Sequence, residues 1–437
     1  MSILGNPVLL SVILMCILCL LKVNVLISLL LSAIAAGLFA GMSIKEVMGI
    51  LIGGMGGNSE TALSYILLGA LAFAIQSAGL ASKLSNALKK VFGKNGTIFV
   101  LVLACIASLS QNLIPVHIAF IPILMPPLLG MMNDMKLDRR AAACSLTFGL
   151  KAPYIMLPIG FGLIFHGIIA DAMTANGMAI DKMTVWKGAL PPGLGMAAGL
   201  FIAVFISYRK KREYLNLPLM ANANIVQKDA EGFTLQHWGA LFGALAAFVI
   251  QLVFGSLPLG AVAGLGIMVA TGAINYRDFD LTMNGGIVLM GFIAFVMLVA
   301  SGYGSVIRET KGVEQLVGAV TGVLGGSRFL AVFFMLLIGL IVTMGIGTSF
   351  GTVPIIATIF VPLCIALDFS VLATASIIAA AGSLGDAGSP VSDSTLGPTA
   401  GLNADGQHSH IWDTCVPTFL HYNIPLFAAG IIAALIL

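Results

Sequence analysis

Charged residues are scarce in this sequence. Lysine, arginine, aspartate and glutamate make up 9% of its 437 residues, whereas soluble domains carry about 25%. Hydrophobic residues make up 59%, and they recur in runs close to the ~20 residues that a helix needs to cross a bilayer. The longest polar stretch, 208–236, is too short to bury a core of its own. The composition therefore excludes a separate soluble domain and predicts an all-α polytopic membrane protein.

Signatures of several functional classes are also missing. The sequence contains no HExxH zinc motif and no nucleotide-binding P-loop. It also lacks the repeated filter sequences from which channels build a pore. Its six cysteines do not have the spacing of metal or redox sites. We therefore expect neither an enzyme nor a primary pump, with no cofactor and no nucleic-acid partner.

Apolar runs and basic clusters predict two halves of similar layout. Basic residues in the loop 83–94 and in the cluster at 209–212 assign that loop and the linker 208–236 to the cytoplasm, because basic loops stay inside. With the predicted spans, this places both termini outside. In the first half, 1–207, we predict spans at 3–21, 23–42, 61–82 and 192–207, a re-entrant helical hairpin at 97–132 and a broken helix at 141–170. In the second half, 237–437, we predict spans at 238–254, 259–274, 285–303 and 416–437, a hairpin at 329–366 and a broken helix at 371–402.

The two halves are predicted to have opposite orientations in the membrane. Basic residues flank the first hairpin on both sides, so it turns back at a polar tip, 108–112, while the tip of the second hairpin, 345–352, is reached from outside. The first broken helix is expected to be interrupted at 147–154 and again at Pro158. This arrangement predicts two inverted repeats, each with scaffold helices, a hairpin and a discontinuous helix, as in secondary transporters.

Two carboxylates lie near the middle of an apolar span. Of eighteen Asp and Glu residues, Asp386 and Asp393 have this position, on either side of Pro390. An ionised aspartate at the bilayer centre costs roughly 2.5–3.5 kcal/mol, so a function must offset it. Carboxylate, hydroxyl and carbonyl oxygens suit a sodium ion or a proton rather than zinc or copper. The alternative is that the two carboxylates only hold the helix break together through backbone N–H groups.

The residues around this break resemble those of a known family. Gly385-Asp386-x-x-Ser389-Pro390-x-Ser392-Asp393-x-Thr395, followed by His410-x-x-Asp413-Thr414-x-x-Pro417, is similar to the motif of NhaC-type sodium/proton antiporters in the ion transporter superfamily. The resemblance implies a multi-pass carrier in the lipid of the bacterial inner membrane, commonly a homodimer, and extends to carriers of organic acids and amino acids. It implies sodium ligands at Thr348, Ser349, Asp386, Ser389, Ser392, Asp393 and Thr395.

The first repeat differs from the second in its charge. Where the second break has carboxylates, the first has Lys151. This lysine could be a counter-ion to Asp386 or Asp393, could replace a second cation, or could bind the carboxylate of a solute, which we favour. Candidate substrate-binding residues are Ser110, Asn112, Thr147, Lys151, Pro153 and Thr352, and His117 either packs in the bundle or relays protons.

The sequence therefore predicts a secondary transporter that works by alternating access. It would couple a sodium or proton gradient to movement of a small carboxylate-bearing solute such as an amino acid. The alternative is a sodium/proton antiporter without an organic substrate.

Overall fold

The computed structural model describes residues 5–21, 23–79, 95–112, 117–159, 161–219, 234–254, 256–312, 315 and 327–437. The predicted basic loop at 83–94, the end of the span 61–82, the turn containing Pro115 and most of the linker 208–236 lie outside the described residues. The described part of the chain is helical and contains no strand. Within it, four helices are long and apolar enough to cross a membrane, and three bent helix pairs pass the same test. The prediction of an all-α polytopic membrane protein is confirmed.

In the first half, polar residues at the helix starts set the boundaries. Asn6 accepts hydrogen bonds from the amides of Val8 and Leu9, and Ser43 forms a capping box with Glu46. The helices are α1 (Pro7–Leu20), α2 (Val25–Phe39), α3 (Ile44–Gly54), α4 (Ser59–Ser77), α6 (Gly96–Asn112), α7 (His117–Asp134), α8 (Arg139–Met156), α9 (Phe161–Ala175) and α10 (Val185–Ile202).

In the second half, serine caps begin several helices in the same way. Ser256, Ser327 and Ser370 each accept a hydrogen bond from a first-turn amide. The helices are α11 (Leu235–Phe254), α12 (Leu257–Ala270), α13 (Phe279–Glu309), α15 (Arg328–Ile346), α16 (Ser349–Ala366), α17 (Val371–Ser383), α18 (Asp393–Leu402), α19 (Val416–Thr418) and α20 (Ile424–Ile436).

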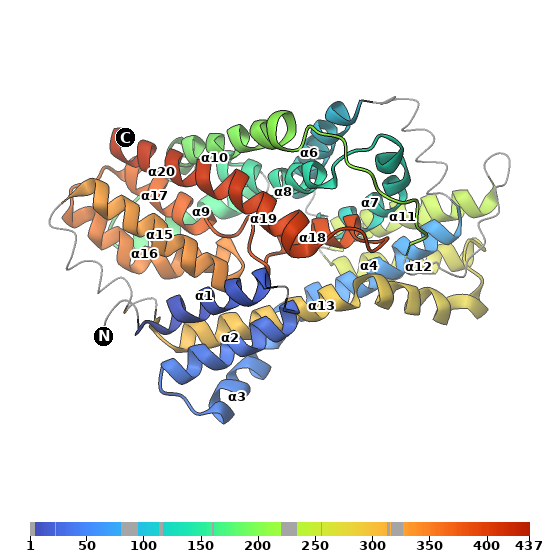
Figure 1. Cartoon of the computed structure of the whole chain (residues 1–437), viewed down its shortest axis with the longest axis horizontal. Helices are drawn as coiled ribbons and strands as arrows, with labels where there is room; N and C mark the ends of the chain where they lie inside the picture. Colours follow the sequence, from blue (N-terminus) through green and yellow to red (C-terminus); the bar gives the residue numbers. More distant parts are fainter. Residues whose placement is uncertain are drawn as a thin grey trace.

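The helices form two groups. Figure 1 shows the first group with α1, α2, α3 and α13 in the lower part of the view and α4, α11 and α12 at the right, and the second group, α8 to α10 and α15 to α20, above and to the left. Contacts between the groups come from α1 and α13 against α15, and from α4 against α7, which in turn packs on α18. The start of α1 and the end of α20 lie toward the same end of the long axis (Figure 1).

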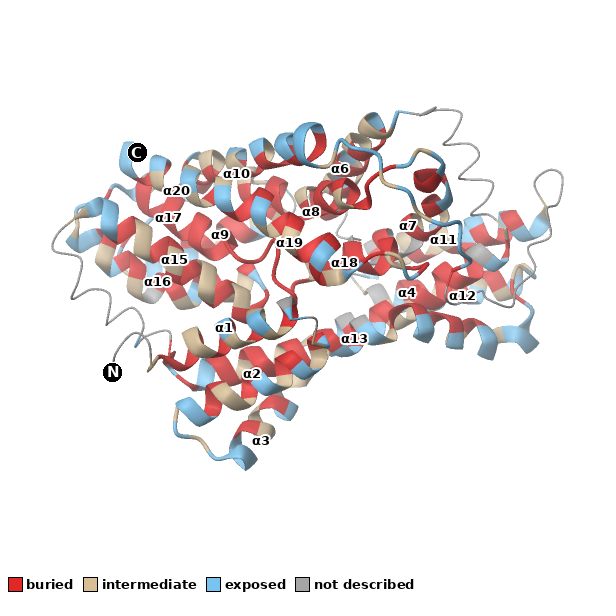
Figure 2. Cartoon of the chain, viewed as in Figure 1, coloured by how far each residue is buried: buried red, intermediate tan, exposed pale blue. Residues whose placement is uncertain are grey.

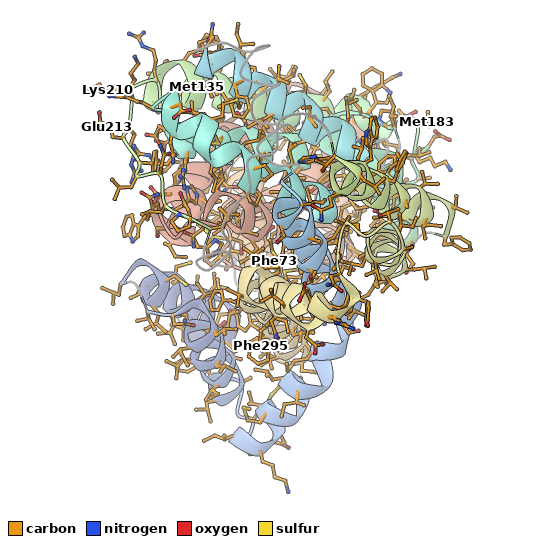
Figure 3. The ribbon with its side chains drawn as sticks, turned by 90° about the vertical axis from the view of Figure 1, so that its right-hand side faces the viewer. Phe73, Met135, Met183, Lys210, Glu213 and Phe295 are labelled. Atoms are coloured by element: carbon orange, nitrogen blue, oxygen red, sulfur yellow. The ribbon has the colours of Figure 1, made fainter. Side chains whose placement is uncertain are left out.

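Small residues let the long helix α13 approach α4 closely. A Cβ at Gly285 would lie 2.3 Å from the ring of Phe73, and one at Gly286 would lie 2.3 Å from the backbone nitrogen of Ala70. Phe73 accordingly faces α13 in Figure 3. Close packing through small residues is the usual way that helices associate in lipid. Figure 2 shows the result, with buried residues concentrated where the helices meet and exposed ones on the outer faces.

Some boundaries differ from those expected. The predicted interruption at 147–154 is wrong: α8 runs without a break to Met156 with Pro153 inside it, and the chain bends by 50° only between Met156 and Phe161. Pro153 lies in the last turn of α8, where one missing amide bond disturbs little of the helix. The short helix α3 was not expected, and the final helical segment begins at His410 rather than at 416, with π-helical turns at 410–415 and 419–423.

Candidate functional site: a charged cluster at a broken helix

The site is built around a break between α17 and α18. The chain leaves the helix after Ser383 and resumes it at Asp393, and nearly every residue between them is buried. Gly385 has a φ of +84°, and a Cβ there would lie 2.4 Å from the carbonyl oxygen of Leu340, so only glycine fits. Ser392 then caps α18 by accepting from the amide of Ser394. The break is therefore fixed by local backbone chemistry.

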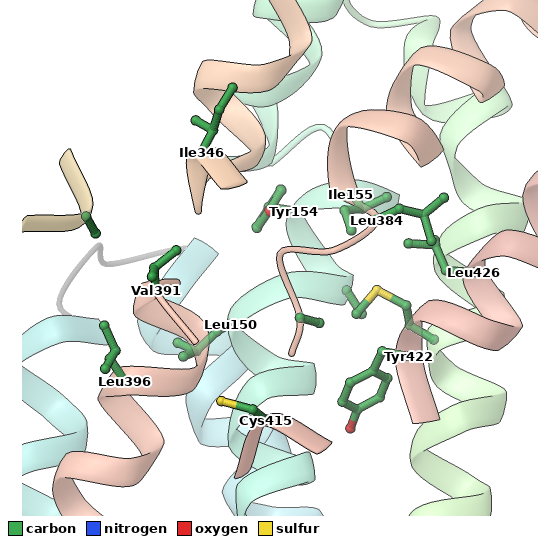
Figure 4. Close-up of a cluster of buried hydrophobic side chains, with 14 of the residues drawn as sticks. Leu150, Tyr154, Ile155, Ile346, Leu384, Val391, Leu396, Cys415, Tyr422 and Leu426 are labelled. Carbon is green, nitrogen blue, oxygen red and sulfur yellow. The ribbon is translucent and has the colours of Figure 1, made fainter. Parts of the chain in front are cut away.

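Side chains satisfy the backbone groups that the break releases. Asn423 accepts from the Gly385 amide at 2.8 Å and donates to the Ala387 carbonyl at 2.6 Å. The Thr395 hydroxyl donates to the carbonyl of Ser389 at 2.5 Å. Figure 4 shows apolar side chains around the same segment, among them Leu384 and Val391. Unpaired backbone groups would be costly here, so these bonds maintain the non-helical segment.

The second component of the site is the tip of the hairpin formed by α15 and α16. Gly347 ends α15 with a φ of +76°, and Ser349 begins α16. The Ser349 amide donates to Oδ2 of Asp386 at 3.0 Å, and its hydroxyl donates to the same oxygen at 2.5 Å. The N-terminus of α16 therefore points at a buried carboxylate, which a helix dipole stabilises.

The third component is Lys151 of α8. Its Nζ lies 2.6 Å from Oδ2 of Asp386 and 3.6 Å from Oδ1 of Asp393. The Asp386 side chain is 0% exposed and that of Lys151 is 8% exposed, whereas that of Asp393 is 34% exposed. One ammonium thus faces two carboxylates, and the fixed charge of these three groups is one negative unit. Asp393 is the more accessible of the two carboxylates.

Tyr154 extends this cluster and was not expected from the sequence. Its hydroxyl donates to the Oγ of Ser349 at 2.9 Å, and its ring centroid lies 5.5 Å from Nζ of Lys151. Tyr154 lies three residues after Lys151, which puts both side chains on one face of α8. The sequence did contain a signal for Tyr154, namely a polar aromatic residue three positions after a lysine inside a predicted membrane segment.

The remaining predicted cation ligands have different environments. Ser392 donates to Oδ1 of Asp386 and so belongs to the cluster. The Ser389 and Thr395 hydroxyls are bonded to backbone carbonyls, of Met344 in the first case and of Ser389 and Ser392 in the second. Thr348 is exposed and precedes α16. The structure thus brings Ser349, Asp386, Ser392 and Asp393 together around Lys151.

The predicted substrate residues are more scattered. Thr147 donates to the carbonyl of Ser394 at 2.8 Å and so ties α8 to the start of α18. Pro153 is buried inside α8, and Thr352 donates to the carbonyl of Thr348 at 2.9 Å within its own helix. The predicted positions whose side chains fall outside the description are Ser110 and Asn112 in α6 and His117 in α7.

A second polar network connects the break to the final helical segment. A ring nitrogen of His410 lies 2.9 Å from the Pro390 carbonyl oxygen, and the other lies 2.8 Å from the Thr399 hydroxyl. Thr399 in turn donates to Thr414 at 2.9 Å, and Thr414 lies 2.7 Å from a ring nitrogen of His408. These hydrogen bonds connect the break to the start of the final helical segment, so a movement of the break would also displace that segment.

A buried ion pair holds the far end of α18. Arg139, at the start of α8, donates to both oxygens of Asp405 at 2.7 and 2.6 Å and to the Leu402 carbonyl at 2.9 Å. Burial raises the pKa of Asp405, but the hydrogen bonds and the charge of Arg139 outweigh it, so the pKa is lowered overall. Residues of the segment after α10 lie across this region: Arg212 donates to Asp413 at 2.7 Å and its amide to the Lys136 carbonyl at 3.0 Å.

These features determine what the site can do. The described residues include no group of three or more His, Cys, Asp or Glu side chains arranged to hold a metal, so a sodium ion would depend on two carboxylates together with serine and backbone oxygens. A buried, charged cluster between a broken helix and a hairpin tip, inside an apolar helical bundle, is typical of carriers that bind their cargo at mid-membrane. Fold and site together define a membrane transporter.

Comparison with known proteins specifies the family. The chain belongs to the Na+/H+ antiporter family, whose model matches residues 145–431, while a second model described as a Na+-H+ antiporter family matches residues 6–92. The resemblance seen in the sequence is confirmed.

Two relatives are similar over their whole length. An uncharacterized membrane protein of Vibrio parahaemolyticus is 46% identical, and YuiF of Bacillus subtilis, whose name assigns it provisionally to amino acid transport, is 44% identical; in both cases 99% of this chain and 100% of the relative are covered. Among solved structures, the YdaH transporter of Alcanivorax borkumensis gives a TM-score of 0.43 at 14% identity over 90% of this chain and 88% of that one. MtrF of Neisseria gonorrhoeae gives 0.45 at 14% identity over 99% and 96%.

Proposed function

We propose that this transporter couples a sodium or proton gradient to the movement of a small carboxylate-bearing solute, most simply an amino acid. The observation that carries the proposal is the cluster of Lys151, Asp386 and Asp393, with one ammonium and two carboxylates in contact. Its net negative charge favours a cation, and the ammonium can pair with a carboxylate from outside the chain. The name of the Bacillus subtilis relative is in keeping with such a solute.

The geometry supports a specific form of coupling. Lys151 is held by Asp386, so a solute carboxylate has to compete for it. A proton or a sodium ion bound between Asp386 and Asp393 weakens that hold, because the carboxylate charge is then compensated. Cation binding therefore frees Lys151 for the solute, and by thermodynamic reciprocity the solute tightens binding of the cation.

Proteoliposomes test this proposal directly. An inward sodium or proton gradient should drive accumulation of an amino acid or small carboxylate found by a thermal-shift screen, since a ligand of the folded state raises apparent stability. Lys151→Ala should weaken solute binding more than cation binding. Sodium-driven proton efflux in the absence of any organic solute, unchanged in Lys151→Ala, would instead establish a sodium/proton antiporter, the function after which the family is named.

A further inference from the structure

A cavity outside the charged cluster has an unusual combination of walls. It has a volume of about 510 Å³ and lies where the start of α6, the turn between α7 and α8, and the end of α10 meet. Its apolar lining includes Val100, Met135, Leu137, Ala141 and Val204. Its cationic lining consists of Lys136, Arg209, Lys210 and Lys211. We call this space the basic cavity.

The negative charges near the basic cavity are already compensated. Asp138 is the one acidic residue in its lining, and this carboxylate accepts three hydrogen bonds from the Arg140 guanidinium. Glu213, which follows the basic run, forms an ion pair of 2.6 Å with Lys136. The three consecutive cations Arg209, Lys210 and Lys211 are all exposed. The cavity thus presents an excess of positive charge above an apolar wall.

The basic cavity lies at the end of a helix that could cross a membrane, which places it near a membrane surface. The helix that ends at Ser207 is long and apolar enough to cross a bilayer, and the three cations follow that end directly. The same helix exposes Phe201, Phe205 and Ile206, with 58%, 36% and 66% of their surface accessible. An apolar stripe that leads into a cationic rim has the polarity of an acyl chain followed by a phosphate group.

From this arrangement we infer that the basic cavity is a binding site for an anionic phospholipid of the surrounding bilayer. The phosphate group lies among Arg209, Lys210 and Lys211, and an acyl chain follows the exposed face of α10 toward Phe201. Met135, Lys210 and Glu213 are found at the same corner of the molecule in Figure 3. The site is separate from the Lys151 cluster, so the inference does not depend on the proposed transport function.

The matched comparison uses two pairs of exposed lysines. Lys210→Gln with Lys211→Gln removes two charges from the rim, whereas Lys182→Gln with Lys187→Gln removes two exposed charges elsewhere, near Met183 on the opposite side of the view in Figure 3. The full chain, purified in detergent, is titrated with phosphatidylglycerol, with phosphatidylcholine of the same acyl chains, or with inorganic phosphate at equal phosphorus concentration. The readout is the apparent melting temperature.

Phosphatidylglycerol should raise the melting temperature, and neither phosphatidylcholine nor phosphate should match it. The Lys210/Lys211 double variant should need on the order of thirtyfold more phosphatidylglycerol, since each basic residue near a surface contributes about 1 kcal/mol. The Lys182/Lys187 control should respond like the natural chain, whose response should also weaken with added salt.

Three results would overturn the inference: an equal response to phosphatidylcholine, an equal response of the rim variant, or a full response to phosphate alone, which would mark a site for free anions. If the double variant does not fold, Arg209→Gln and the salt dependence of the natural chain decide the question in the same way.

Discussion

At the scale of single residues, Asp386 and Asp393 carry the same charge in different surroundings. Asp386 is fully buried and accepts hydrogen bonds from Lys151, Ser349 and Ser392. Asp393 is 34% exposed and lies 3.6 Å from the lysine. The first therefore holds the cluster together, and the second is the more accessible carboxylate, to which our proposal assigns exchange of the cation.

Asparagine substitutions separate these roles. Asp393→Asn should abolish cation-dependent transport while the melting temperature changes little, because a partly exposed charge is lost. Asp386→Asn should also abolish transport and in addition destabilise the protein, by about 3–5 kcal/mol if it behaves like other broken buried pairs. Uptake by proteoliposomes and thermal unfolding are the two measurements.

Asp171→Asn serves as the control, because Asp171 is exposed on α9. This variant should transport and unfold like the natural chain. Normal cation dependence in Asp393→Asn would place the cation outside the cluster and contradict the assignment.

At the scale of the elements, the break between α17 and α18 depends on glycine at a positive φ. Gly385→Ala should destabilise the protein well beyond the ~1–2 kcal/mol of a left-handed alanine, because its Cβ would lie 2.4 Å from the Leu340 carbonyl oxygen. Transport should fall with it, since Asp386 is the next residue. Thermal unfolding and uptake are compared in the same preparation.

Gly41 provides a matched control for this substitution. Its φ is +85°, almost the same as the +84° of Gly385, but a Cβ at Gly41 would have nothing within 4 Å. Gly41→Ala should therefore show the backbone penalty alone and leave transport intact. Equal losses in the two variants would mean that crowding at the break is not what requires glycine.

The elements were easier to predict than the contacts between them. Glycine, proline and hydroxyl clusters identified the tip after α15 and the break after α17, because local chemistry alone prevents a helix there. The same reasoning failed at Pro153, where burial of nearly the whole of α8 keeps the helix continuous. Helix α3 was missed because its eleven residues are well short of the ~20 apolar residues by which spans were recognised.

In the site, too, the contacts between residues were harder to predict than the residues themselves. The pairing of Lys151 with Asp386 was one of three alternatives in the sequence, and a contact between residues 235 positions apart had to be seen in space. Asn423 was missed because one amide in an apolar span says nothing about the two backbone groups that it bonds, at Gly385 and Ala387. The inverted repeat, the sodium ligands and the homodimer stay predictions.

At the scale of the whole molecule, the pair of Arg139 and Asp405 makes stability depend on pH. The pKa of Asp405 is lower in the folded protein than the ~3.9 of a free aspartate. Its contribution is therefore complete above about pH 4 and is lost as the pH falls through the folded-state pKa. Asp405→Asn should lower the melting temperature at neutral pH and flatten its decline in acid.

Gln407→Ala is a useful comparison for this pH experiment. It removes the hydrogen bond that the Gln407 side chain donates to Asp405 at 2.8 Å. The bond from the Gln407 backbone amide and the ion pair with Arg139 stay in place, so the acid dependence should persist. An Asp405→Asn protein with the same acid profile as the natural chain would show that other carboxylates set it.

The orientation of the chain can be measured independently of any substrate. Cysteines at 136 and 210 should be labelled from the same side, because the Arg212 amide donates to the Lys136 carbonyl at 3.0 Å, and that side should be the cytoplasm. A cysteine at 182 should be labelled only from outside. The exposed Cys105 is first replaced by serine. Labelling of 136 and 210 from opposite faces would contradict the contact between them, and labelling of 90 and 136 from opposite faces would turn the predicted hairpin 97–132 into a full crossing.

The ion pairs between the two halves have a consequence for the synthesis and membrane insertion of the protein. Lys151 and Arg139 leave the ribosome long before Asp386 and Asp405, which follow them by 235 and 266 residues. A lysine alone at the centre of a helix costs roughly 2.5–3.5 kcal/mol on insertion. We therefore expect α8 to insert poorly into lipid by itself and to become stable there only after the second half of the chain has been synthesised.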